Sequence, residues 1–325
     1  MNHNGSKAIA KSLIEMAARN GLQAVKFQKR DIEQLAIEEI LETEDLRFPE
    51  FGRTYGDIRR SLEFSDNDYF ELKNFAEQLD IDFFITPFDT QSLKLIEDLK
   101  LEIIKIASHS VTNTDLLEEI ASLNIDMILS TGMCHLSELD EAVRILDKSK
   151  GNLVLLHCVS SYPLSHKNAN LNIIDFLRSR YGLPVGYSGH EVDYLPTIFA
   201  FAKGARVIER HITLDKTLNG FDHKLSLDES ELKNLLSELE SITEMFGDGE
   251  KKLNNFEEIT RNKYRVSMVS ARNLTKGAIL NLNDITWKNP GVGIPRNKLN
   301  NFIGKILNKD IAKDALILEE DFYSE

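Results

Sequence analysis

The 325-residue chain has few cysteines and no long apolar run. Cys134 and Cys158 are its only cysteines, and they form neither a CxxC pair nor a metal-like cluster. This argues against a disulfide scaffold and fits a reducing compartment. No stretch of about 18 apolar residues occurs, and the opening MNHNGS contains no signal-peptide core. We therefore expect a cytoplasmic protein with no membrane partner.

Positive charge is also scarce. Lysine and arginine number 39 against 52 acidic residues, which leaves a formal net charge of −13. No basic stretch could neutralise the phosphates of nucleic acid, so we expect no nucleic-acid partner. Neither a Walker pattern nor a GxGxxG loop is present, which disfavours ATP and dinucleotides. An anionic substrate would need a few lysines placed locally.

What the chain does contain is a recurring alternation of short β-branched runs and longer amphipathic stretches. This alternation is typical of βα units and a parallel sheet. Seven strands are predicted, at residues 23–28, 82–88, 102–108, 126–132, 153–161, 184–190 and 206–213. Their C-terminal ends are unusually polar, and in a parallel barrel those ends face one shared cavity. The pattern therefore predicts an α/β protein with a (β/α)8 TIM barrel and an active site at that face.

A complete barrel needs eight strands, and the first predicted helix, residues 7–20, precedes all seven. We therefore expect the missing first strand to lie before residue 1, and an open seam to leave two exposed strand edges. The composition shifts after Phe246. We assign residues 1–246 to the barrel, 247–263 to a linker and 264–325 to a small domain of short strands and turns. About 60 residues is marginal for an independent core, so the small domain is expected to rest on something larger.

Two histidines, His190 and His211, end neighbouring predicted strands. A single histidine is more often structural, but two imidazoles on adjacent strand ends favour a site for a divalent ion such as Mn²⁺, with positions left for substrate oxygens. Two lysines, Lys26 and Lys105, also lie at strand ends and predict an anion site with nearby hydroxyls. Those hydroxyls belong to Ser108, Ser130 and Thr131. The alternative is an internal salt bridge from the lysines to Glu209.

Two carboxylates complete the candidate site. Glu209 precedes His211 by two residues, so both face the same side of a strand. Asp222 follows the turn at Gly220 and lies within reach of the barrel mouth. Either carboxylate could move protons or orient substrate hydroxyls.

Nine short motifs in this order resemble the sialic acid synthase family, whose members condense phosphoenolpyruvate with a mannosamine derivative. The resemblance covers nearly the whole chain, and its C-terminal part is similar to the family's antifreeze-like (SAF, β-clip) domain. The motifs are NHNGS (2–6), AVKFQ (24–28), TPFD (86–89), KIAS (105–108), STGM (130–133), HC with SSYP (157–163), GYSGH (186–190), ERHITLD (209–215) and GFDH (220–223).

The resemblance implies roles for individual positions. His190 and His211 match the metal ligands, for which Mn²⁺ is expected with Mg²⁺ or Co²⁺ as alternatives. Glu209 matches the acid beside the metal. Positions matching the phosphoenolpyruvate site are Lys26, Thr86, Lys105, Ser108, Ser130 and Ser188. Positions matching the sugar site are Gln28, Phe88, Tyr162 and Asp222, and Ser160 stands where many bacterial members have asparagine.

The family also implies a domain-swapped homodimer in which each antifreeze-like domain covers the partner's barrel mouth. Asn289 stands where many bacterial members send an arginine into the partner's site, and Arg296 is a candidate replacement. The family's first strand ends in a glutamate that this sequence does not contain.

The leading functional hypothesis is an N-acetylneuraminate synthase that uses phosphoenolpyruvate, N-acetylmannosamine and water. Within this class the acceptor could instead be a 2,4-diacetamido-2,4,6-trideoxy sugar, as in legionaminate synthesis, or N-acetylmannosamine 6-phosphate. Outside it, a metal-dependent aldolase, another phosphoenolpyruvate-condensing synthase or an inactive sugar-binding relic remain open.

Overall fold

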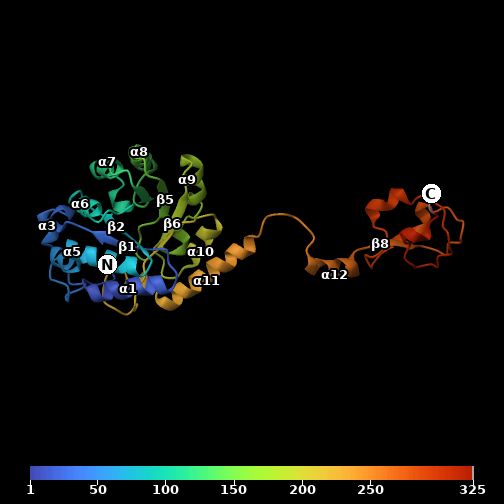
Figure 1. Cartoon of the computed structure of the whole chain (residues 1–325), viewed down its shortest axis with the longest axis horizontal. Helices are drawn as coiled ribbons and strands as arrows, with labels where there is room; N and C mark the ends of the chain where they lie inside the picture. The colour runs from blue at the N-terminus through green and yellow to red at the C-terminus, as the bar shows by residue number, and fades with distance from the viewer. Residues whose placement is uncertain (324–325) are drawn as a thin grey trace. The chain divides into compact units, whose positions relative to one another are not determined.

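The computed structural model describes residues 1–323, which form two compact units divided after Phe246. The first unit is built on a seven-stranded sheet in the order β1 to β7, and every neighbouring pair is parallel (Figure 1). The predicted fold class is therefore confirmed. Its strands are β1 (Ala24–Lys29), β2 (Asp82–Pro87), β3 (Ile103–Ile106), β4 (Asp126–Ser130), β5 (Leu153–Cys158), β6 (Val185–Gly189) and β7 (Ile208–Arg210).

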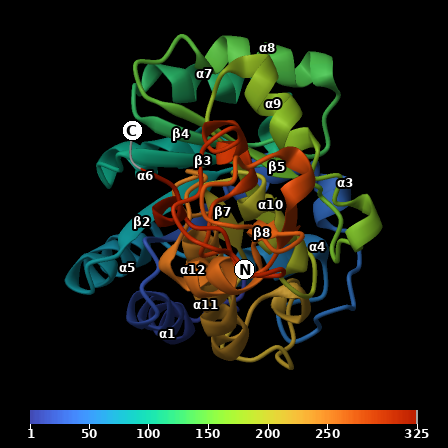
Figure 2. The ribbon, with the colours of Figure 1, turned by 90° about the vertical axis from the view of Figure 1, so that its right-hand side faces the viewer.

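Helices connect the strands and lie outside them, as α6 to α9 show in Figure 2. Helices α1 and α5 to α10 contribute buried apolar residues to the core around the sheet, because parallel sheets are covered by their crossover helices. The helices of this unit are α1 (Lys7–Arg19), α2 (Ile32–Leu35), α3 (Glu38–Leu41), α4 (Tyr55–Leu62), α5 (Asp66–Gln78), α6 (Gln91–Asp98), α7 (Thr114–Ser122), α8 (Leu136–Leu146), α9 (Ile173–Tyr181), α10 (Leu195–Ala202) and α11 (Glu229–Phe246).

The sheet is curled so strongly that its two end strands approach each other. Lys26 on β1 and Glu209 on β7 lie 3.7 Å apart, although five strands separate them in the sheet order. Among residues 1–323, no ladder joins β1 to β7. A curled sheet directs the C-terminal ends of all seven strands toward a common centre, which is the geometry of a barrel mouth.

The segment Asn2–Gly5 crosses between the two end strands. The Asn2 side-chain amide donates to the Ile212 carbonyl at 2.7 Å and to the Ser226 hydroxyl at 2.6 Å. Asn4 donates to the Asn219 carbonyl at 2.9 Å. The motif NHNGS therefore joins the start of the chain to the loop that follows β7. We call this set of hydrogen bonds the asparagine clasp.

The second unit, from Gly247 onward, has its own small core. A two-stranded antiparallel sheet, β8 (Ser267–Ser270) and β9 (Ile285–Lys288), packs with buried residues such as Met268, Leu280 and Phe322. Helix α12 (Asn255–Tyr264) precedes this sheet and has no buried residue. Across both units, residues 1–323 also contain six short 3₁₀ helices, η1 (Ser108–Ser110), η2 (His166–Asn168), η3 (His223–Leu225), η4 (Leu282–Asp284), η5 (Arg296–Asn301) and η6 (Glu319–Asp321).

Several strands end earlier than the sequence predicts. β7 has three residues rather than the expected eight, and beyond it Ile212 forms only an isolated bridge to Leu227. The polar residues after each strand leave the ladder and turn into the mouth, so strand propensity alone overestimates strand length. None of the helices within residues 1–323 is long and apolar enough to cross a membrane.

Candidate active site

Two lysines and one glutamate form the centre of the candidate site. Glu209 lies between Lys26, at 3.7 Å, and Lys105, at 3.8 Å, and it accepts a hydrogen bond from the Ser188 hydroxyl at 3.2 Å. The Lys105 side chain is only 2% exposed, and its ammonium donates to the Ser130 hydroxyl at 2.7 Å. The geometry is therefore compatible with both an internal salt bridge and an anion site. The two lysines share the single carboxylate of Glu209, so one positive charge is left over for an anion.

The charges in this centre shift one another's pKa values. Burial alone would raise the pKa of Glu209, but Lys105, Lys26 and the two histidines outweigh it and lower that pKa to about 2. Burial lowers the pKa of Lys105 to about 8, with Lys26 adding to this effect and Glu209 opposing it. At neutral pH Glu209 is therefore ionised and Lys105 is still largely charged.

Small polar groups surround this centre. The Ser108 hydroxyl accepts a hydrogen bond from the Gly132 backbone N–H at 2.9 Å. A Cβ at Gly132 would come within 2.5 Å of the Ser160 hydroxyl and 2.8 Å of the Ser108 hydroxyl, so only glycine leaves this pocket open. Thr86 is 1% exposed, and its hydroxyl has no partner among residues 1–323. A buried hydroxyl without a partner is costly, and a bound ligand would satisfy it.

His190 is held in a defined orientation at the end of β6. Its Nδ1 donates to the Val159 carbonyl at 3.0 Å and lies 3.9 Å from the Cys158 sulfur. Because a carbonyl can only accept, the proton of a neutral His190 is on Nδ1 and the lone pair is on Nε2. The ring of Tyr162, which is 53% exposed, lies 4.2 Å from the imidazole centroid.

His211 lies beside His190, with ring centroids 5.6 Å apart, and its Nδ1 is 3.6 Å from an oxygen of Asp222. Burial lowers the pKa of His211 to about 4, which keeps its imidazole neutral at pH 7. A neutral imidazole with a carboxylate behind it is a good metal ligand. Within residues 1–323, however, no group of three or more His, Cys, Asp or Glu side chains is arranged to hold a metal ion. The pair fits a divalent ion as a partial shell that substrate or water oxygens would complete.

The remaining sugar-site candidates lie on β1, just after β2, and in the loops after β5 and β7. The Gln28 side-chain oxygen accepts from Arg30 at 2.6 Å, and the Arg30 guanidinium lies 3.9 Å over the Phe88 ring. Thr86 is the register partner of Gln28. Asn289 and Arg296 belong to the second unit, where Arg296 packs on the ring of Trp287.

Sequence reasoning did not single out Arg30, Arg59, Cys158 or Asn2. Arg30 and Arg59 lie on β1's C-terminal extension and on α4, and nothing in their spacing indicates that they meet. Asn2 was noted only as part of a motif, whereas its amide joins two segments more than 200 residues away.

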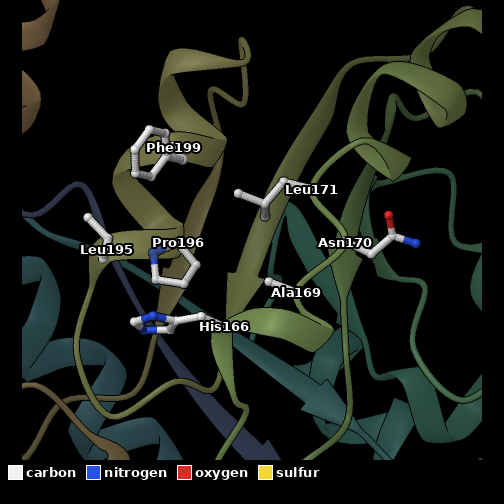
Figure 3. A pocket seen from close by; sticks show the side chains of 7 residues that line it. All are labelled: His166, Ala169, Asn170, Leu171, Leu195, Pro196 and Phe199. Carbon is white, nitrogen blue, oxygen red and sulfur yellow. The ribbon is translucent and has the colours of Figure 1, made fainter.

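An open hollow of about 260 Å³ lies between the loop after β5 and the start of α10 (Figure 3). It is lined by His166, Ala169, Asn170, Leu171, Leu195, Pro196 and Phe199. None of the candidate site residues lines it, so the chemistry of the strand ends and this hollow are separate features.

A curled parallel sheet with charged and hydroxyl side chains gathered at its C-terminal strand ends defines the class of (β/α)-barrel enzymes. The chain belongs to the NeuB family, whose model matches residues 13–251, and a SAF domain matches residues 265–322. The family resemblance and the C-terminal domain type expected from the motifs are thus confirmed.

Related proteins agree with this assignment. The chain is 38% identical to N,N'-diacetyllegionaminic acid synthase of Campylobacter jejuni, over 98% of this chain and 97% of that protein. It is 35% identical to N-acetylneuraminate-9-phosphate synthase of Drosophila melanogaster, over 98% and 92%. Among solved structures, N-acetylneuraminic acid (sialic acid) synthetase from Leptospira borgpetersenii, in complex with citrate, has a TM-score of 0.69 and 35% identity over 80% of this chain and 86% of that chain.

Proposed function

We propose that this chain condenses phosphoenolpyruvate with the aldehyde of an N-acetylmannosamine-type sugar to give a nonulosonic acid and inorganic phosphate. Its function lies in the NeuB synthase class. The observation that carries the reaction is the position of Lys26 and Lys105 on either side of the ionised Glu209. The imidazoles of His190 and His211 lie next to each other at the same mouth. The arrangement offers one cationic pole for a phosphate and one carboxylate for a developing positive charge.

The lysines and hydroxyls would hold phosphoenolpyruvate. Lys105, with Ser130 as its hydrogen-bond partner, supplies a buried cation, and Lys26 supplies a second. Thr86 and Ser108 would donate to the same anion, and Gly132 keeps the space between Ser108 and Ser160 open. Fixing the phosphate and carboxylate in this way places C3 of phosphoenolpyruvate against the sugar aldehyde, which removes much of the entropic cost of the encounter.

Glu209 would stabilise the intermediate. When C3 of phosphoenolpyruvate forms the new bond to the aldehyde carbon, positive charge develops at C2. Water adds to C2, and cleavage of its C–O bond then releases phosphate from the tetrahedral intermediate. A carboxylate with a pKa of about 2 stays ionised throughout and faces the developing charge without reorganising.

His190 and His211 would hold a divalent ion, for which we propose Mn²⁺. Such an ion supplies Lewis-acid polarisation of the sugar aldehyde when bound. Asp222 orients His211, and the Val159 carbonyl orients His190. Tyr162, Gln28 and Phe88 would contact the sugar.

We also propose that two chains form a domain-swapped homodimer. Helix α12 supports this proposal, because Phe256 is 91% exposed and Ile259 and Tyr264 are also exposed. A helix that exposes several apolar side chains is suited to contact a second copy. In such a dimer the second unit, with Arg296, would cover the partner's barrel mouth.

The test of the reaction is release of inorganic phosphate from phosphoenolpyruvate with N-acetylmannosamine, N-acetylmannosamine 6-phosphate or a 2,4-diacetamido-2,4,6-trideoxy sugar. Each assay is run with Mn²⁺ and with EDTA. We expect release that depends on an acceptor and on the metal. A simple aldolase would release no phosphate, and a sugar-binding relic would bind ligand without turnover, so either result contradicts the proposal.

A further inference from the structure

The ladder between β6 and β7 stops one residue before each of the two histidines. Its last register pair is Gly189 and Arg210, so His190 and His211 are the first residues beyond it. Separate partners orient the two rings, a backbone carbonyl for His190 and a carboxylate for His211. Neither of these contacts joins one histidine to the other. The separation of the two imidazoles therefore depends on how firmly the two strand ends are joined where the ladder stops.

A buried ion pair joins the strand ends at this level, on the outer face of the sheet. Side chains alternate along a strand, so Arg210 points away from the mouth that receives Glu209 and His211. There it meets Glu191, the residue after His190. Nη1 of Arg210 donates to Oε1 of Glu191 at 2.9 Å, and Nη2 donates to the Glu191 backbone carbonyl at 2.8 Å. The Glu191 side chain is 1% exposed and that of Arg210 is 4% exposed, so water hardly reaches the pair.

The Glu191 carboxylate also fastens the strand ends to helix α10. Oε1 accepts a hydrogen bond at 2.8 Å from the hydroxyl of Thr197, a fully buried residue of α10. Oε2 accepts from the Tyr187 hydroxyl of β6 at 3.1 Å. A Cβ at Gly189 would lie 2.7 and 2.8 Å from the two carboxylate oxygens, so a glycine directly before His190 leaves the room that they occupy. The carboxylate is thus held from β6, β7 and α10 at once.

Stability alone is a weak reason for such a pair. Taking two charges out of water costs free energy, which their attraction offsets only where the hydrogen bonding is complete. Here the Nε of Arg210 is buried and has no partner among residues 1–323. The best-attested use of a buried polar pair is to fix one arrangement of neighbouring segments. The segments that this pair joins are the two that carry His190 and His211.

We propose that Glu191 and Arg210 form a positioning pair for the metal site, which holds His190 and His211 at the separation at which one divalent ion can bind both imidazoles. This inference rests on the proposed function. The two ring centroids lie 5.6 Å apart. Groups that orient metal ligands from behind commonly account for about 10- to 100-fold in metal affinity. Both members of the pair face away from the mouth, so they act through the histidines and not on the substrate.

The test measures the affinity of the full chain for Mn²⁺ by electron paramagnetic resonance, without substrates. Glu191→Gln should weaken Mn²⁺ binding by about 10- to 100-fold, because a neutral amide does not form the ion pair. Arg210→Lys keeps the charge but loses the two-pronged contact, and it should cause a smaller loss.

The matched control is Asp140→Asn, on α8. Asp140 also accepts hydrogen bonds from an arginine and a tyrosine, Arg180 at 2.8 Å and Tyr181 at 2.7 Å, both on α9. It is on an element that carries neither histidine, so its substitution should leave the affinity for Mn²⁺ unchanged. A loss in this control as large as that in Glu191→Gln would overturn the inference.

A double variant separates positioning from stability. Glu191→Leu combined with Arg210→Met removes both charges and fills the space with apolar side chains, which should restore the melting temperature that Glu191→Gln lowers. The affinity for Mn²⁺ should stay low, because the link between the strand ends is gone. The affinity of the unmodified chain in this double variant would show that the pair is only structural. If the double variant does not fold, unchanged affinity in folded Glu191→Gln overturns the inference in the same way.

Failure of the proposed function would look different. If no acceptor supports phosphate release, the proposed reaction fails. Mn²⁺ binding that His190→Ala abolishes and Glu191→Gln weakens would still support the positioning pair. Mn²⁺ binding that His190→Ala leaves unchanged would place the ion elsewhere and overturn the pair, and so would phosphate release with unchanged Mn²⁺ affinity in Glu191→Gln. Melting curves confirm which variants are folded.

Discussion

The lysine side and the histidine side of the barrel mouth differ in the charge that their side chains carry. At the ends of β1 and β3, Lys26 and Lys105 bring permanent charge, and Glu209 offsets only part of it. Around the end of β6 and just past β7, His190 and His211 lie close together, and His211 is kept neutral by burial. Under the proposed function, the lysine side would receive an anion directly, whereas the histidine side would bind a divalent ion first. Glu209 is the group that both sides share.

Removing the shared carboxylate should have the largest effect. Glu209→Gln leaves two lysines near each other without a counter-charge and removes the group that faces the developing positive charge. We expect kcat to fall by about 10³-fold, in the range seen when one preorganised electrostatic group is lost. Phosphate-release kinetics measure the effect. An unchanged kcat would refute the role of Glu209. Lys105→Met in the Glu209→Gln background should recover thermal stability but not activity.

Next in size is loss of an imidazole. His190→Ala and His211→Ala should each weaken Mn²⁺ binding by about 10- to 100-fold and lower turnover with it, because each would remove one of the two imidazoles of the proposed metal site. Mn²⁺ affinity can be followed by electron paramagnetic resonance. His157→Ala is a matched control, because His157 is also buried in β5 but bonds to the Ala169 carbonyl. Unchanged metal-dependent turnover in both variants would reject the site.

A single methyl group should affect only the lysine side. In Gly132→Ala the new Cβ would press on the Ser160 and Ser108 hydroxyls at 2.5 and 2.8 Å. We expect the KM of phosphoenolpyruvate to rise by about tenfold, since displaced donors misplace the substrate. Mn²⁺ affinity should stay the same. An effect on the metal and none on KM would contradict the separation of the two sides.

The mildest test is pH. The pKa of Lys105 is lowered to about 8, so its ammonium loses charge as the pH rises through 8. We expect kcat/KM for phosphoenolpyruvate to fall about tenfold per pH unit above that value. The free energy of unfolding should change in the opposite direction as the pH rises. Between pH 8 and the ordinary lysine value of 10.5, the unfolded chain binds the extra proton, so this group makes the free energy of unfolding rise with pH.

Lys105→Arg keeps its charge throughout this range and should flatten both profiles. A decline in kcat/KM that persists unchanged in this variant would assign the titration to another group. Chemical denaturation at pH 7.5 and pH 9.5 measures the stability arm.

The sequence was a good guide to the strands and a poor guide to their ends. Short β-branched runs that alternate with amphipathic stretches locate all seven strands. The strands of a parallel sheet are buried on both faces and are therefore made of apolar runs. The pattern overestimates β7, which ends at Arg210, so that Glu209 is still in the ladder and His211 lies beyond it. A capping pattern at Ser226 and Glu229 also looks like a helix start. Instead Asp228 and Glu231 cap α11, and the Ser226 hydroxyl accepts from Asn2.

The candidate site was predictable where the functional side chain lies at or just beyond the C-terminal end of a strand. Lys105, His190 and Glu209 each occupy such a position, so their meeting follows from barrel geometry. The convergence of Arg30 and Arg59 was not predictable in this way. Arg59 is on α4, in the long excursion between β1 and β2, and its approach depends on how residues 30–64 fold over the mouth. No local sequence pattern encodes how close these two arginines come.

The asparagine clasp has a consequence for how the barrel opens. Asn2 is bonded to the Ile212 carbonyl, one residue after His211, so its two hydrogen bonds hold the strand end that carries this imidazole. Side-chain bonds break individually, whereas a strand ladder breaks cooperatively. We therefore expect amide hydrogen exchange to be faster near β7 than in β4 or β5. Opening at this seam would disturb His211 before it disturbs the lysines, so the metal side of the mouth should be the first to lose its shape on heating.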